Sequence, residues 1–489
     1  MQKLGNQMLG SLPSRVARPT YDRSRVKIGI VHFGVGGFHR AHQAMYVDQL
    51  MNQGEALDWG ICGVGVLPVD RRMRDALERQ DCLYTLVVKN ADGRYDARVI
   101  GSIVDYRYAP DDPEAVLALM AAPSTRIVSM TVTEGGYNFV PATGEFNFDN
   151  PDVVHDLAGG AVPRTLFGFV SEALRRRRAG GIPPFTVMSC DNIQGNGDVA
   201  RKMFTAFADR KDADLGKWLR ESVAFPNCMV DRITPVTTEE DIAQVAGRFG
   251  IEDAWPVVTE PFTQWVLEDH FPASRPPYQQ AGVQMVHDVE PYELMKLRLL
   301  NASHQALAYF GRLAGYVLKH DAVQNPAFAK FVMNYMTQEA TPTLRPVPGV
   351  DLDAYRHALI ERFANPEVRD TIARIAINAS DKIPKWLLPV VHANLASSGE
   401  ISRSAAVVAS WARFAEGRDE QGQPIEVVDL LKDELRAIAV QNREKPTIFI
   451  ENRAIFGDLS QNPRFVDAYL KALNSLYAVG ALETIKRFG

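Results

Sequence analysis

The first half of the chain alternates short apolar runs with segments of helical spacing. Four runs rich in β-branched residues predict strands, at residues 26–33, 61–67, 126–133 and 185–189. Between them, apolar residues recur every three or four positions, as over residues 39–51 and 163–178. Strands that alternate with helices predict an α/β fold with a parallel-rich sheet covered by helices on both faces.

The pattern changes at about Pro291. Segments rich in Ala, Leu, Met, Arg and Glu follow at residues 294–318, 327–339, 352–363 and 402–415, and convincing strands disappear. This predicts a mostly α-helical C-terminal part. A chain of 489 residues is long enough for two or three domains. We therefore expect a nucleotide-binding domain over residues 1–288 and a helical substrate-binding and catalytic domain over residues 289–489.

A glycine-rich turn follows the first predicted strand. Gly34 and Gly36 form a Gly-x-Gly pattern there, and such glycines let the backbone turn tightly and approach a pyrophosphate. His39 stands where the dinucleotide motif has its third glycine. Asp70 lies further on than the ~20 residues usual for the acid that binds the ribose. The turn alone indicates a dinucleotide site, with a plain strand–helix turn as the alternative.

Composition and charge narrow the class of protein. With 46% hydrophobic and 23% charged residues, the chain is typical of a folded globular protein. A net charge of −5 gives no reason to expect nucleic acid or a membrane surface as a partner. No segment reaches about 18 uninterrupted apolar residues, and the N-terminus has no apolar core of signal-peptide length.

Cysteine and histidine spacing gives no reason to expect a metal. The four cysteines are scattered and form neither a disulfide framework nor a zinc-ligand pattern: Cys62, Cys82, Cys190 and Cys228. Free thiols are typical of the reducing cytoplasm. His39 and His42 could share a helix face, but no carboxylate or cysteine nearby completes a ligand set.

Residues 291–310 predict a buried helix that carries polar groups. At about 100° per residue, apolar side chains occur nearly all the way round, as in a buried helix. Yet Glu293, Lys296, Asn301 and His304 fall within roughly 140° of one another. Burying such groups without partners is costly, so their grouping predicts a walled cavity that receives a polar ligand.

This helix also suggests a chemistry. Burial lowers the pKa of a lysine because desolvation disfavours the charged amine. A neutral Lys296 could take the proton of an alcohol as hydride leaves its carbon. Asn301 and His304 could hydrogen-bond the developing alkoxide. A structural Lys–Glu pair beside a satisfied core histidine is the alternative, and residues 291–310 alone fit both.

Four stretches, in order along the chain, resemble the polyol-specific long-chain dehydrogenase family. They are GVGGFHRAH at 34–42, SCDNIQGNG at 189–197, FPNCMVDRITP at 225–235 and MKLRLLNASH at 295–304. The resemblance extends from about residue 26 to about residue 456. It implies a Rossmann-type N-terminal domain, a helical C-terminal domain, NAD as cofactor and no metal. It also accounts for His39 in place of glycine.

The resemblance implies roles for the matching residues. Lys296 occupies the general-base position, Asn192 and Asn301 the positions that hold the reacting oxygen, and His304 a substrate-orienting position. Glu293 matches a glutamate that passes protons between the lysine and solvent. The implied substrate-binding residues are Asp231, Arg374 and Lys382. The implied cofactor-binding residues are Gly34, Gly36, Phe38, His39, Arg40, Asp70, Glu134 and Asn192. Asp70 favours NAD over NADP, although Val69 stands where some members have a second acid.

The implied activity is NAD-dependent oxidation of a secondary alcohol of an open-chain polyol to the ketose, with D-mannitol to D-fructose as the leading case. Fructuronate reductase, which interconverts fructuronate and D-mannonate, is a rival, because Arg374, Lys382 and Lys385 could bind a carboxylate. D-Arabinitol 4-dehydrogenase is another. A non-catalytic NAD-binding protein would predict the loss of a catalytic residue, yet Lys296, Asn301 and His304 are present. We expect a monomer or weak homo-oligomer in the cytoplasm.

Overall fold

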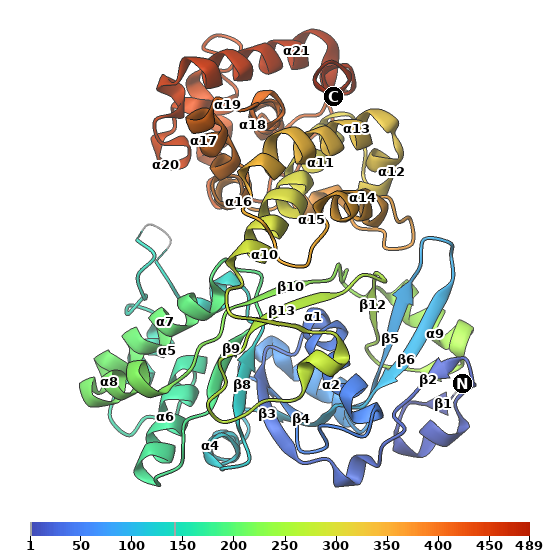
Figure 1. Ribbon diagram of the computed structural model, residues 1–489, viewed down its shortest axis with the longest axis vertical. Coiled ribbons are helices and arrows are strands. Elements are labelled where there is room, and N and C mark those ends of the chain that lie inside the picture. Colours follow the sequence, from blue (N-terminus) through green and yellow to red (C-terminus); the bar gives the residue numbers. More distant parts are fainter. Residues whose placement is uncertain (1, 141–142) are drawn as a thin grey trace. The chain divides into compact units, whose positions relative to one another are not determined.

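The computed structural model describes residues 2–140 and 143–489. The chain divides into two compact units, Met1–Val289 and Glu290–Gly489. Each unit has its own elements and its own packed interior, and Figure 1 gives the labels used below. The strands of the central sheets lie in the first unit, whereas the second consists of helices joined by turns.

The first unit is built on a five-stranded sheet in which every neighbouring pair is parallel. In spatial order the strands are β7 (Ile103–Tyr108), β4 (Gly60–Gly65), β3 (Ile28–Phe33), β8 (Ile127–Met130) and β9 (Thr186–Ser189). The chain runs outward from β3 to β7 and then returns to β8, on the other side of β3. This doubly wound order places the topological switch point, where such sheets bind ligands, between β3 and β8.

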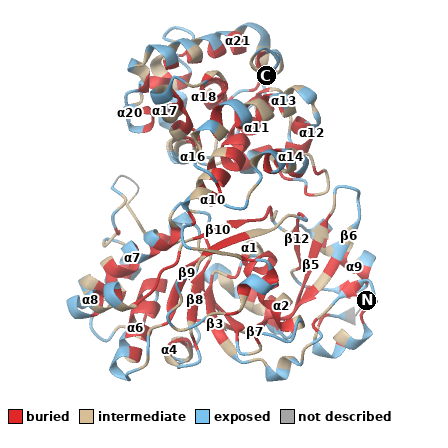
Figure 2. Ribbon diagram, in the orientation of Figure 1, coloured by how far each residue is buried: buried red, intermediate tan, exposed pale blue. Residues whose placement is uncertain are grey.

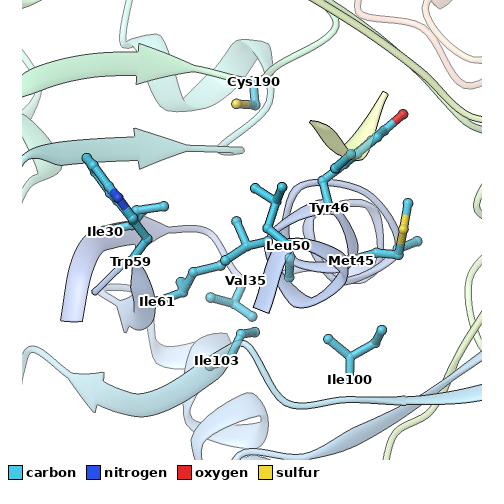
Figure 3. Close-up of a cluster of buried hydrophobic side chains, with 14 of the residues drawn as sticks. Ile30, Val35, Met45, Tyr46, Leu50, Trp59, Ile61, Ile100, Ile103 and Cys190 are labelled. Atoms are coloured by element: carbon cyan, nitrogen blue, oxygen red, sulfur yellow. The ribbon is translucent and has the colours of Figure 1, made fainter. Parts of the chain in front are cut away.

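Alternate side chains of the sheet enter two separate apolar clusters. Ile30, Ile61 and Ile103 pack with α2 (Gln43–Asn52) and α3 (Arg71–Glu78), and Figure 3 shows these three isoleucines beside Leu50 of α2. The alternate side chains of β3 point the other way. They pack against α4 (Pro113–Ala121), α6 (Leu166–Ala179) and α7 (Asn196–Lys211). The sheet is therefore buried on both faces, as Figure 2 also shows.

Smaller sheets complete the first unit. A four-stranded sheet has the order β12 (Val257–Thr259), β5 (Tyr84–Lys89), β6 (Tyr95–Ile100) and β2 (Val16–Ala17). A three-stranded sheet has the order β10 (Cys228–Asp231), β13 (Gln264–Glu268) and β14 (Gln284–Val286). Strand β1 (Gln2–Lys3) pairs with β11 (Ile251–Glu252). The remaining α-helices are α1 (Gly37–Ala41), α5 (Pro151–Leu157), α8 (Ala213–Ser222) and α9 (Glu239–Phe249), and short 3-10 helices join the elements.

The second unit begins with one long helical stretch. It comprises α10 (Glu290–Met295), the π-helix η6 (Lys296–Asn301) and α11 (Ala302–Leu313). The following elements are α12 (Lys319–Gln324), α13 (Pro326–Asn334), the π-helix η7 (Tyr335–Ala340), α14 (Leu352–Phe363), α15 (Ile372–Ala376), α16 (Ala379–Trp386), α17 (Leu388–Ser397), α18 (Ser402–Ala415), α19 (Lys432–Ala439), α20 (Arg453–Phe456) and α21 (Pro463–Phe488). Helix α11 packs against α15 and α18, and α18 packs against α21.

The predicted fold class is confirmed: the first unit is a Rossmann-type domain with a parallel sheet, and the second is helical. Helices α14 and α18 have the bounds predicted from the spacing. The helix predicted to reach residue 318 ends at Leu313, because Gly315 adopts a left-handed φ of 88°. Among the described residues, no helix is long and apolar enough to cross a lipid bilayer.

Candidate functional site

Several predicted cofactor residues follow the carboxyl ends of neighbouring parallel strands. Gly34 follows β3, Asp70 follows β4, Glu134 follows β8 and Asn192 follows β9. Because parallel strands end at the same edge of the sheet, these residues lie along one edge. Glu134 and Asn192 are exposed there. The first unit thus gathers these residues at the switch point of the sheet.

Gly34 and Gly36 lack side chains for different structural reasons. Gly34 has φ of +81°, and a Cβ atom there would lie 2.2 Å from the carbonyl oxygen of Thr131. The Thr131 hydroxyl donates a 2.7 Å hydrogen bond to the Gly34 carbonyl and so ties the β3 and β8 loops together. A Cβ on Gly36 would meet nothing closer than 3.9 Å. Gly34 is thus required for the turn, whereas Gly36 leaves backbone open to a ligand.

His39 and Arg40 lie beneath this loop. His39 is 1% exposed and stacks on His32 with ring centroids 3.4 Å apart. Burial lowers the pKa of His39 to about 3, so the ring is neutral near pH 7. Arg40 is also buried, and its guanidinium donates to the carbonyls of Gly36 and Trp255. Both side chains therefore support the turn from inside the protein.

The helix predicted over residues 39–51 is interrupted at His42, where φ is −123° and ψ is −92°. His42 Nε2 lies 2.9 Å from the carbonyl oxygen of Gln264. The Nδ1 atom of the same His42 ring lies 2.9 Å from Gln43 Nε2. The half-buried ring of Phe38 stacks on His42. His39 and His42 therefore do not share a continuous helix face. In the described part of the chain, no group of three or more His, Cys, Asp or Glu side chains is placed to hold a metal ion.

Asp70 closes the turn that follows β4. Its Oδ2 accepts hydrogen bonds of 2.9 Å from the backbone amides of both Val66 and Leu67. These bonds fix the carboxylate just beyond the end of the strand. An acid at the end of the second strand of a doubly wound sheet is placed to accept hydrogen bonds from the ribose hydroxyls of a dinucleotide.

Asp191 also lies at this edge, although it was not predicted as a site residue. Its carboxylate accepts hydrogen bonds from the amides of Val132 (3.1 Å) and Thr133 (2.8 Å) and from the hydroxyl of Tyr137 (2.8 Å). It thus ties the Glu134 turn to the β9 end, and Thr133 is held at φ of 60°. Burial raises the pKa of Asp191 to about 6, although the three donors oppose the rise. The available signal was an acid two residues after a buried strand.

Asp231 lies at the end of β10 and is buried. The next residue, Arg232, donates to the carbonyl of Ala41 at 2.6 Å and to the carbonyl of Glu260 at 3.3 Å. These bonds join the end of β10 to the end of α1, which follows the glycine turn. The segment matched by the VDRITP pattern is therefore part of the same unit as the cofactor loop and is bonded to its helix.

In the second unit, one helical stretch carries four predicted catalytic residues, and all are buried. The exposed fractions are 7% for Glu293, 6% for Lys296, 3% for Asn301 and 8% for His304. The stretch is not α-helical throughout, because Lys296–Asn301 forms a π-helix in which the Ala302 amide bonds the Leu297 carbonyl five residues back. Residues five apart then lie one turn apart, which puts Lys296 and Asn301 on one face. Such π segments are frequent at functional sites.

Asn301 and His304 each carry a buried atom that lacks a partner. Asn301 Nδ2 and His304 Nε2 have no hydrogen-bond partner among residues 2–140 and 143–489. Burial and the nearby Lys319 hold the pKa of His304 well below its usual value, so the ring is neutral. A buried polar atom left unpaired costs about 1–3 kcal/mol. These two atoms, on residues three apart in one helix, therefore suit a ligand rich in hydroxyl groups.

The two predicted C-terminal substrate residues lie on neighbouring helices of the second unit. Arg374 is on α15, with its side chain 48% exposed, and its Nε and Nη2 contact the carboxylate of Asp370 at 2.6 and 2.7 Å. Lys382 is on α16, and its ammonium lies 5.6 Å from the centroid of the Trp386 ring. Asp370 was not singled out from the sequence, where no pattern marks it.

This architecture defines a dinucleotide-dependent dehydrogenase: a doubly wound nucleotide-binding unit, and a helical unit with a buried lysine beside unpaired polar atoms. Residues 28–280 match the family model described as "Mannitol dehydrogenase Rossmann domain". Residues 288–477 match the model described as "Mannitol dehydrogenase C-terminal domain". The chain belongs to the mannitol dehydrogenase family, and the resemblance carried by the four motifs is confirmed.

Individual relatives match along nearly the full chain. The mannitol 2-dehydrogenase of Phaeosphaeria nodorum is 49% identical over 490 residues, which cover 99% of this chain and 85% of the relative. A solved structure of Pseudomonas fluorescens mannitol 2-dehydrogenase, a ternary complex with NAD and D-mannitol, is 44% identical. Its TM-score is 0.90, and 99% of each chain is covered. A substrate-free D-sorbitol dehydrogenase structure has a TM-score of 0.90 and 39% identity over 99% of this chain and all of that chain.

Proposed function

We propose that the protein is an NAD-dependent polyol dehydrogenase that oxidises D-mannitol to D-fructose, with Lys296 as the base. The observation that carries this proposal is the buried helical stretch on which Lys296 accompanies the unpaired Nδ2 of Asn301 and Nε2 of His304. The likeness to a 44% identical enzyme solved with NAD and D-mannitol supports the choice of cofactor and substrate.

The reaction removes a hydride from a carbinol carbon and a proton from its hydroxyl group. NAD, when bound, supplies the hydride acceptor. Lys296 in its neutral form accepts the hydroxyl proton, and its burial favours that form. Asn301 donates a hydrogen bond to the oxygen as negative charge develops on it, and we propose an oxygen-binding role for Asn192 as well. Neutral His304 orients a substrate hydroxyl, and Glu293 passes the proton from Lys296 towards solvent.

The first unit supplies the residues that would hold the cofactor. The open backbone at Gly36, shaped by the strained turn at Gly34, suits a pyrophosphate. Asp70 would accept hydrogen bonds from the hydroxyls of the adenosine ribose and would disfavour a phosphate there. Phe38, His39 and Arg40 shape the loop, while Glu134 and Asn192, which follow β8 and β9, would help to hold the cofactor, Asn192 near its nicotinamide. We assign substrate-binding roles to Asp231 of the first unit and, separately, to Arg374 and Lys382 of the second.

The charges around Arg374 support a neutral polyol over a sugar acid. Asp370 occupies the Nε–Nη2 edge of Arg374, and a guanidinium edge of this kind pairs bidentately with carboxylates. Lys385 is paired with Asp381 at 2.6 Å. Two of the three cations that could receive a uronate carboxylate thus already have carboxylate partners within their own unit.

The setting of the enzyme is part of the proposal. All four cysteines are buried free thiols, which supports the reducing cytoplasm as its location. Members of the family are often monomeric, which supports a monomer or a weak homo-oligomer. The partners we propose are NAD and a small polyol or keto-sugar.

The test compares initial rates with NAD on D-mannitol, D-sorbitol, D-arabinitol and D-mannonate. We expect the highest kcat/KM on D-mannitol. Lys296→Ala should lower kcat about 10²- to 10⁴-fold while NADH still binds, and Lys330→Ala, at an exposed lysine of α13, should be unchanged. Turnover confined to D-mannonate would refute the substrate. A Lys296→Ala enzyme that keeps its rate would refute the base, and NADH binding without turnover of any substrate would favour a non-catalytic protein.

A further inference from the structure

Asp370 lies at the centre of an ion cluster inside the second unit. Its Oδ2 is 3.0 Å from the Lys319 ammonium, and Arg374 contacts both of its oxygens. The side chains of Lys319 and Asp370 are 2% and 1% exposed, whereas that of Arg374 is 48% exposed. The carboxylate therefore links a fully buried cation to one that reaches solvent.

The backbone fixes Asp370 independently of Arg374. The Lys319 amide donates a 2.9 Å hydrogen bond to the Asp370 carbonyl, and the Ile372 amide donates one of 2.9 Å to the Val317 carbonyl. These bonds flank the antiparallel bridge between Leu318 and Thr371. Two segments about 50 residues apart are thus joined where the carboxylate projects, and the cluster has a rigid base.

The charges of the cluster keep the carboxylate ionised. Burial tends to raise the pKa of Asp370, but Lys319 and Arg374 outweigh it and hold that pKa well below its usual range. Phe363 connects the cluster to the catalytic helix, because its ring lies 5.2 Å from the Lys319 ammonium and 4.7 Å from the His304 ring. The cluster therefore lies beside a residue proposed to bind substrate.

We propose that Asp370, anchored by Lys319, is a positioning residue that holds Arg374 in the one orientation needed to bind a substrate hydroxyl. The inference rests on the role of Arg374 in the proposed function. A guanidinium has five N–H donors, and Asp370 occupies Nε and one side of Nη2. The Nη1 donors point away from the bonded edge and are left for a ligand. A long side chain fixed in advance binds more tightly, because binding no longer has to order it.

The test is a double-mutant cycle with Asp370→Asn, Arg374→Met and the double variant. KM for D-mannitol, kcat at saturating NAD and NADH affinity are measured for each. Arg374→Met should raise KM about 10- to 100-fold, because a hydrogen bond from a charged group is lost. Asp370→Asn should raise KM to a similar extent, and the double variant should be no worse than Arg374→Met. Values of kcat and NADH affinity should change little.

The matched control is a pair with the same spacing on the next helix. Asp381 and Lys385 are also four residues apart, with a 2.6 Å contact, but their side chains are 50% and 52% exposed. Asp381→Asn should leave KM unchanged. Arg374→Lys retains the charge and leaves the buried Lys319–Asp370 pair intact, so it is informative even if Asp370→Asn does not fold. We expect it to raise KM nearly as far as Arg374→Met, because lysine lacks the fork that Asp370 orients.

The possible failures are distinguishable. If Arg374→Met leaves KM unchanged, Arg374 does not bind substrate, and that part of the proposed function is wrong. If Arg374→Met raises KM but Asp370→Asn does not, or if the two effects multiply in the double variant, Asp370 does not act through Arg374. A wild-type KM in Arg374→Lys would likewise overturn the positioning role and leave a role for charge alone.

Discussion

The two units present their candidate polar groups in opposite ways. In the first unit, Glu134 and Asn192 are exposed just beyond the ends of their strands, and the contacts that shape these segments bond mostly to backbone amides and carbonyls. In the second unit, Lys296, Asn301 and His304 are buried on a helix whose neighbours form ion clusters. The first site therefore depends on chain conformation and the second on charge compensation, so each should be sensitive to a different kind of substitution.

The comparison is tested most severely at the glycine turn. Gly34→Ala would place a Cβ 2.2 Å from the Thr131 carbonyl at a φ of +81°, so we expect a loss of about 4 kcal/mol or more of unfolding free energy. Gly36→Ala has open space, and its stability should stay within about 1 kcal/mol of wild type. Its NADH affinity should nevertheless fall at least about tenfold, because the methyl group occupies the ligand's approach.

Urea unfolding and NADH titration of both variants separate the two roles. Equal stability of the two variants would mean that the strain at Gly34 does not matter. Unchanged NADH binding by a folded Gly36→Ala enzyme would mean that the pyrophosphate does not approach this backbone. Either result would remove the reason for treating the first site as one made by chain conformation.

A buried cation provides the corresponding test of the second unit. Lys319→Met removes one of the two cations that contact the carboxylate of Asp370, which is 1% exposed, and leaves Arg374 in place. Breaking a buried ion pair by removing one partner costs about 3–5 kcal/mol, so we expect a loss of about 3 kcal/mol in urea unfolding. Lys385→Met breaks an exposed pair of the same unit and should cost no more than about 0.5 kcal/mol. Similar losses for both would show that burial of the charges does not set their importance.

In both units, the elements that could be predicted from sequence are those with a local signal. The strands around Gly34 were predictable because β-branched runs and glycines are local signals, and helices α14 and α18 were predictable because their spacing is regular. The break at His42 has no local signal of this kind. The π-helix Lys296–Asn301 was not predicted either, because a helical wheel assumes α-helical spacing throughout.

Long-range partners were the part of the site that could not be predicted. Asp191 gains its importance from amides almost 60 residues earlier, and Asp370 from Lys319, 51 residues away. Periodicity describes which face of an element is buried, but it does not say which distant residue compensates a charge there. The residues that hold the sites in place therefore emerged only from the folded structure.

Asp191 should make the free energy of unfolding depend on pH. Burial raises its pKa to about 6 in the folded state, so between about pH 4 and 6 the folded protein keeps a proton that the unfolded chain releases. Stability should therefore fall as pH rises through this window, by about 3 kcal/mol at most. Asp191→Asn should lessen this slope and weaken NADH binding, because the single amide oxygen of asparagine cannot accept from all three donors that the two carboxylate oxygens share.

Asp48 is the matched control for this prediction. Burial also raises its pKa to about 6, but its partners are Tyr21, Asn52 and the Gly101 amide, which lie outside the cofactor loops. Asp48→Asn should flatten the same part of the stability profile without changing NADH affinity. If both variants weaken NADH binding equally, the effect of Asp191 is a general loss of stability and says nothing about the Glu134 turn.

The smallest expected effect concerns the choice of cofactor. Asp70→Asn keeps an oxygen that can accept from the amides of Val66 and Leu67, so the turn should persist while the charge is lost. The ratio of kcat/KM for NADP to that for NAD should rise about tenfold. A carboxylate accepts hydrogen bonds from the ribose hydroxyls of NAD and repels the ribose phosphate of NADP, and an amide does not repel it. Asp75→Asn, at a partly exposed acid of α3 paired with Arg74, should leave the ratio unchanged. An unchanged ratio in Asp70→Asn would mean that Asp70 serves only to close the turn, and that even a charged side chain of the first unit acts mainly through the backbone.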